Sequence, residues 1–78
     1  MTEPLHSETP ASNPLLQVSP REVQVLEMTS QGLTNDEIAK RLNVTTHAVK
    51  FHLASIYRKL GVANRTEAAV VYLRSTGV

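Results

Sequence analysis

Side chains able to ligate a metal or catalyse a reaction are few in this sequence, which has three histidines and no cysteine. His47 and His52 would lie about 140° apart around a helix, too far to share one metal ion. No carboxylate stands near them to complete a site. There is no carboxylate pair on one face, no glycine-rich loop and no serine–histidine arrangement above chance. We therefore expect no metal, no cofactor and no enzymatic activity.

The stretch 44–61 carries a more informative pattern. On a helix turning about 100° per residue, its large aliphatic side chains align in one narrow stripe that must face a core. These are Val49, Leu53, Ile56 and Leu60. The opposite side combines cations, small groups and one aromatic ring, which is unusual on a solvated surface. Its members are His47, Lys50, Phe51, Ala54, Ser55 and Arg58.

Such a ridge suits the major groove of DNA. There, cations meet phosphates or guanine edges, and an apolar group can meet a thymine methyl. The alternative, equally weighted on this stretch alone, is that Phe51 packs against a neighbouring element.

The charge distribution also favours a polyanionic partner. The net charge is only +1, but residues 1–17 contain two acids and no lysine or arginine, so all eight cations follow. Six of them fall between Ile38 and Thr66, where there is no acid: Lys40, Arg41, Lys50, Arg58, Lys59 and Arg65. Clustered cations flanked by acids indicate a face turned toward nucleic acid, although a solvated surface is the alternative.

Size and hydropathy set the class of protein. A chain of 78 residues supports one small domain. No apolar run approaches the roughly 20 residues of a membrane span, and the amino end lacks a signal segment. We expect a chain that acts in the cytoplasm, not in a membrane.

Four repeated start signals predict the elements that position the ridge. Ser19, Thr34, Thr45 and Asn64 each read as a helix cap, and a glutamate follows three of them at capping-box spacing. The predicted helices span residues 20–30, 35–42, 46–60 and 65–76, and no segment alternates as a strand would. The prediction is an all-α, four-helix domain over residues 18–78. It is preceded by a disordered tail or linker over residues 1–17, in which Leu15 and Leu16 dock onto the folded part.

The last predicted helix is apolar around most of its circumference. One stripe can pack on the domain, which leaves a second one for a partner. We expect a homodimer surface formed by Glu67, Val70, Val71 and Arg74, since a two-fold copy is the simplest partner. The alternative is a monomer with two half-exposed valines.

The assembled motifs resemble the LuxR-type (GerE-like) helix-turn-helix domain of bacterial transcription regulators. They cover nearly all of the ordered part without gaps. The motifs are S-P-R-E-x-x-V-L-E at 19–27, Q-G-L-T-N-D-E-I-A at 31–39, R-L at 41–42, A-V-K-F-H at 48–52, R-K-L-G-V at 58–62 and N-R-T-E-A at 64–68.

The resemblance implies sequence-specific binding of double-stranded DNA by a transcription regulator. Its third helix, about 46–60, would lie in the major groove, and its last helix would form the homodimer. Base contacts are expected from Lys50, Phe51 and Ala54. Phosphate contacts are expected from Thr45, Thr46, His47, His52, Arg58, Lys59, Asn64 and Arg65. RNA polymerase is a candidate partner.

Two residues depart from the family pattern. Ala54 stands where a longer polar side chain is usual, and Phe51 replaces a small aliphatic, so the DNA sequence read need not be the familiar one. The competing function is a protein-interaction module in which Phe51 and the valines of the last helix are the main contacts.

Overall fold

The computed structural model describes residues 13–77, and within them every regular element is helical. A 3-10 helix, η1 (Pro14–Gln17), is followed by four α-helices: α2 (Pro20–Ser30), α3 (Asn35–Leu42), α4 (Thr46–Leu60) and α5 (Arg65–Ser75). The predicted all-α, four-helix fold is confirmed, with α5 ending one residue earlier than expected. The predicted disorder of residues 1–12 lies outside the described residues.

The predicted caps start the helices. Ser19 and Glu22 form a complete capping box on α2, and Thr34 with Glu37 does the same on α3. Thr45 caps α4 by accepting the Ala48 N–H at 3.0 Å. Such side-chain acceptors satisfy amide donors that the first turn of a helix leaves without partners.

The start of α5 differs from the prediction in one detail. Asn64 caps it by accepting the Glu67 N–H at 3.0 Å. Glu67, however, accepts the Ala63 N–H at 2.8 Å, so its carboxylate closes the preceding turn rather than the expected box with Asn64.

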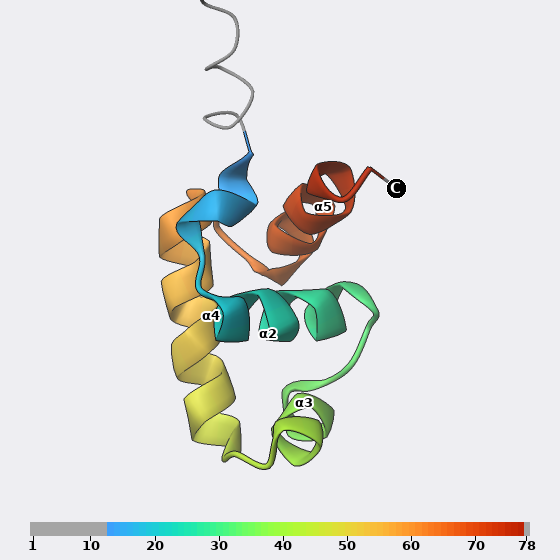
Figure 1. Ribbon diagram of the computed structural model, residues 1–78. Helices are drawn as coiled ribbons and strands as arrows, with labels where there is room; N and C mark the ends of the chain where they lie inside the picture. The colour runs from blue at the N-terminus through green and yellow to red at the C-terminus, as the bar shows by residue number, and fades with distance from the viewer. Residues whose placement is uncertain (1–12, 78) are drawn as a thin grey trace, which may run out of the picture.

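A tight turn sets the angle between α3 and α4. Asn43 ends α3 in the left-handed region at φ 57°, and the Val44 N–H returns to the Ala39 carbonyl. Asparagine tolerates this conformation better than most residues. Because Thr45 already caps the next helix, α4 leaves at a sharp angle to α3 (Figure 1).

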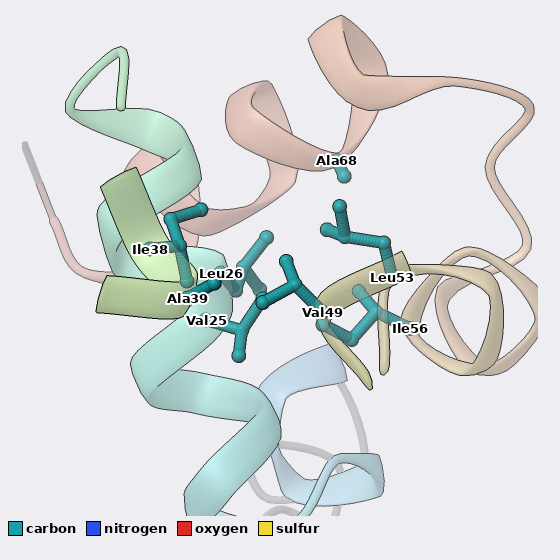
Figure 2. Packing of buried hydrophobic residues seen from close by; sticks show 8 residues of the cluster. All are labelled: Val25, Leu26, Ile38, Ala39, Val49, Leu53, Ile56 and Ala68. Carbon is teal, nitrogen blue, oxygen red and sulfur yellow. The ribbon is translucent and has the colours of Figure 1, made fainter. Parts of the chain in front are cut away.

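The core lies where the four α-helices meet. α2 packs against α3, α4 and α5, and α4 runs along one side of the molecule (Figure 1). Aliphatic side chains from all four fill the space between them (Figure 2): Val25, Leu26, Ile38, Ala39, Val49, Leu53, Ile56 and Ala68. The stripe predicted on α4 is therefore buried as expected, except that Leu60 lies half-buried at its end.

The short helix η1 lies before residue 18, the first residue of the predicted domain. Asn13 caps η1 by accepting the Leu15 N–H at 3.0 Å, with Pro14 in the first turn. Leu15 packs against the core as expected, whereas Leu16 remains 65% exposed. An asparagine cap followed by proline is a local start signal for this short helix.

Candidate nucleic-acid interface

The outer face of α4 presents the predicted ridge. Phe51 is 71% exposed, more than any other large hydrophobic side chain in residues 13–77. Lys50, Ala54, Arg58 and His47 are exposed as well. The alternative in which Phe51 packs on a neighbouring element is therefore wrong. A ring without protein cover stands among cations, opposite the stripe that fills the core.

His52 borders this ridge without lying on it. Its side chain is half-buried, and its ring meets that of Phe51 edge to face, with the centroids 6.2 Å apart and the planes at 66°. This is a favourable aromatic arrangement. It leaves most of the Phe51 ring exposed.

Ser55 does not belong to the free side, where the helical pattern had placed it. It is 9% exposed, and its hydroxyl donates to Glu22 Oε2 at 2.8 Å. The physical reason is that α2 covers this flank of α4 and brings a buried carboxylate to it. A hydroxyl with an acceptor can be buried there at little cost.

The same carboxylate binds Lys59. Its Nζ lies 2.9 Å from Glu22 Oε1, which also accepts the Ser19 N–H at 2.8 Å. Burial raises the Glu22 pKa, but the hydrogen bonds from Ser19, Lys59 and Ser55 and the Lys59 charge outweigh it and lower this pKa from 4.5 to about 2. The ionised carboxylate of Glu22 therefore links α2 to Ser55 and Lys59 of α4.

The sequence predicted Glu22 only as a capping-box partner. The signal for its second role was weak: Ser55 and Lys59 stand four residues apart and so project from the same flank of α4. Nothing local indicates which acid would meet them.

Arg65 also has partners inside the domain. Its guanidinium donates to Asn35 Oδ1 at 2.9 Å and to the Leu33 carbonyl. These bonds tie the first turn of α5 to the segment that begins α3. Arg65 thus helps hold the arrangement of helices around α4, whatever it contacts outside.

The remaining predicted phosphate contacts cluster at two helix starts. Thr45 and Asn64 are exposed, with their side-chain oxygens engaged as caps, and Thr46 is half-buried in the first turn of α4. Helix amino ends carry partial positive charge and suit a phosphate. Their contact with DNA stays a prediction.

Ion pairing reduces the number of available cations. Of the six between Ile38 and Thr66, Lys40 pairs with Asp36 at 3.4 Å and Lys59 pairs with Glu22. Within residues 13–77, Arg41, Lys50 and Arg58 are exposed with no acidic group within salt-bridge distance. Two of these three lie on the α4 ridge.

The outer face of α5 has a different apolar pair from the one predicted. Val70 is 41% exposed and Leu73 is 39% exposed, whereas Val71 is half-buried. Glu67 and Arg74 are exposed at its edges. We define the Val70–Leu73 face as these four residues. Leu73 was missed because the run of six apolar residues hides which of them faces outward.

Residues 13–77 hold no group of three or more histidine or carboxylate side chains placed to bind a metal ion. None of the helices described there combines the length and the hydrophobicity needed to cross a bilayer.

Three relatives show what the chain is similar to. It is 46% identical over 57 residues to YhjB, a putative HTH-type transcriptional regulator of Escherichia coli (strain K12), covering 73% of this chain and 28% of YhjB. It is 41% identical over 68 residues to the transcriptional regulatory protein LnrK of Bacillus subtilis (strain 168), covering 87% of this chain and 31% of LnrK. It is 37% identical over 65 residues to the nitrate/nitrite response regulator protein NarP of Escherichia coli (strain K12), covering 83% of this chain and 30% of NarP.

The chain therefore spans less than a third of each of these relatives. The family model described as bacterial regulatory proteins, luxR family, matches residues 16–72, which include the end of η1, the turn between α3 and α4, and the ridge. With four helices in the expected order, the chain belongs to the LuxR family of bacterial regulatory proteins and carries the helix-turn-helix DNA-binding domain of its transcriptional regulators.

Proposed function

We propose that this chain binds double-stranded DNA sequence-specifically, with α4 in the major groove and Lys50, Phe51 and Ala54 against the bases. One observation carries the proposal: Phe51 is 71% exposed, opposite the buried stripe, on a ridge whose two cations, Lys50 and Arg58, have no ion-pair partner within residues 13–77. An α-helix fits a major groove by size, and base-edge contacts supply specificity there. The protein acts as a transcription regulator at DNA, hence in the cytoplasm, and not as an enzyme.

The phosphate contacts fall into two groups. Arg58 and His47 are exposed on the ridge, and the amino ends of α4 and α5 begin at Thr45 and Asn64. Exposed cations and helix starts position a protein on the duplex without reading its sequence. Each side chain or helix start in this first group can contact a phosphate without a change in the packing of the domain.

The second group consists of Lys59 and Arg65, which already have internal partners. The Lys59 side chain is 37% exposed beside Glu22, and an ammonium has three donors. Arg65 uses two of its five donors on Asn35 and Leu33. Both keep donors for a phosphate, and their internal bonds would orient them. Thr46 and His52, both half-buried, complete the proposed set.

The Val70–Leu73 face is the proposed dimer surface. Two exposed aliphatic residues flanked by Glu67 and Arg74 suit a two-fold contact in which each acid can meet the partner's cation. A dimer of this kind would read two half-sites about one helical turn apart. RNA polymerase is a candidate further partner.

Selection of bound duplexes from a random pool tests the function directly. We expect an enriched motif with two-fold symmetry, and affinity for it that falls steeply with salt because phosphate-bound counterions are released. A protein-interaction module, which the exposed Phe51, Val70 and Leu73 would also suit, predicts no enrichment and no salt-dependent duplex binding. That result would overturn the proposal.

A further inference from the structure

The centre of the ridge is apolar, although cations surround it. Phe51 is 71% exposed and Ala54 is exposed three residues further on, so both lie on one face of α4. Lys50 precedes the ring and stands four residues before Ala54. A ring exposed among cations offers apolar surface for a partner to cover. Residues 38–66 contain six cations and no acid, which favours a polyanionic partner.

These three side chains can detect only a narrow range of base chemistry. Lys50 can donate to the acceptors of a guanine edge, but neither Phe51 nor Ala54 can donate or accept a hydrogen bond. The one apolar group on the major-groove edge of a base pair is the methyl on C5 of thymine. Cytosine carries a methyl at the equivalent ring position when it is methylated on C5.

The position of the ring suits such a contact. His52 meets the ring edge to face, at 6.2 Å between centroids, and Phe51 is still 71% exposed. Ala54 adds only a methyl, so the backbone of α4 can lie close to the bases at that point. A longer side chain there would hold the helix away from them.

We propose that Phe51, with Ala54 beside it, recognises a pyrimidine C5 methyl next to the base that Lys50 contacts. The ligand is then a duplex with thymine, or 5-methylcytosine, at that position. This inference rests on the proposed function, and it adds that methylation of cytosine can create or strengthen a binding site for this chain.

The test uses the motif enriched from the random pool and the whole 78-residue chain. Each thymine of the motif is replaced singly by uracil, which removes only the C5 methyl, and each cytosine singly by 5-methylcytosine. Dissociation constants are measured by fluorescence anisotropy at one salt concentration. We expect one thymine in each half-site to lose about fourfold in affinity as uracil, the effect of one buried methyl. With cytosine at that position, adding the methyl should raise affinity by a similar factor.

Two variants test whether Phe51 is the residue that causes the loss of affinity when uracil replaces thymine. In Phe51→Ala the thymine and uracil duplexes should bind alike. In the control Arg58→Ala, which loses a cation from the same ridge, affinity should fall for both duplexes while their ratio is kept. Because Phe51 is exposed, its variant should melt like the parent, which circular dichroism checks.

The outcomes separate the inference from the function beneath it. An enriched motif whose affinity ignores every uracil replacement overturns the inference alone, as does a uracil effect that survives in Phe51→Ala. A pool that yields no motif overturns the proposed function and the inference with it.

Discussion

Replacing Glu22 by glutamine should destabilise the domain in a pH-dependent way. The substitution keeps the shape of the side chain but removes the charge that Lys59, Ser55 and the Ser19 N–H share. The pKa of Glu22 is about 2 instead of 4.5. At about 1.4 kcal/mol for each unit of pKa, the ionised carboxylate contributes about 3 kcal/mol at neutral pH. Glu22 is only 5% exposed, but the side chain of its partner Lys59 is 37% exposed, so solvent screening makes about 3 kcal/mol an upper value.

The sign follows from proton linkage. A carboxyl whose pKa is lower in the folded state contributes its full stabilisation above its unfolded pKa of about 4.5, and loses it as the pH falls toward about 2. The parent should therefore lose about 3 kcal/mol between pH 5 and pH 2 through this group. Glu22→Gln should start about 3 kcal/mol lower at pH 7 and lack this part of the pH dependence.

Urea unfolding followed by circular dichroism, at pH 7 and at steps down to pH 2, measures both effects. Glu27→Gln is the matched control, because Glu27 lies on the same helix, is exposed and makes no side-chain hydrogen bond or ion pair with any residue of the described range 13–77. We expect it to change the free energy of unfolding by no more than about 0.5 kcal/mol. If Glu22→Gln unfolded at the parent's urea concentration, with the parent's pH profile, the tie between α2 and α4 would not stabilise the fold.

Four further predictions concern DNA binding, the dimer and the arrangement of the helices. Lys50→Ala should cost roughly 1–3 kcal/mol on the selected duplex and relax the preference at one base pair, as binding to single-base variants of the motif would show. Arg58→Ala should instead weaken binding to specific and random duplexes alike, and lower the slope of log affinity against log salt concentration by about 1. If both variants weakened both duplexes equally, the proposal that Lys50 reads a base and Arg58 contacts phosphate would be refuted. Leu73→Glu should shift the chain toward monomer in sedimentation while keeping the parent's helical circular dichroism, and an unchanged dimer fraction, or a monomeric parent, would exclude the Val70–Leu73 face. Arg65→Ala should cost about 1–3 kcal/mol in urea unfolding, since it leaves Asn35 and the Leu33 carbonyl without their donor; an unchanged midpoint would show that these bonds add nothing.

Helix boundaries were the most predictable part of the fold, because they depend on neighbours in the chain. Each cap of α2 to α5 accepts an amide three residues further on, so the cap and its partner are visible together in the sequence. Asn13 caps η1 in a related way, by accepting the Leu15 N–H two residues further on.

The candidate site was predictable in part. The helical period of α4 identified the buried stripe, and hence the side that had to be free. The helical period could not show that Ser55 and Lys59 have an internal partner, since both lie between the stripe and the ridge. Their partner Glu22 stands 33 and 37 residues away in the chain. The helical period could not identify Leu73 as exposed either, because its exposure depends on how α5 packs against α2.

By itself, then, the sequence determined where each helix begins, which face of α4 is apolar and where the cations gather, because all three follow from spacing along one chain. The tertiary structure decided which groups remain available at the surface. It took Ser55 into the interior, paired Lys59 and Arg65 with atoms from other helices, and left Phe51 uncovered. The physical reason is that burial and ion pairing depend on which helix packs against which flank, and that is decided only when all four α-helices close on a common core.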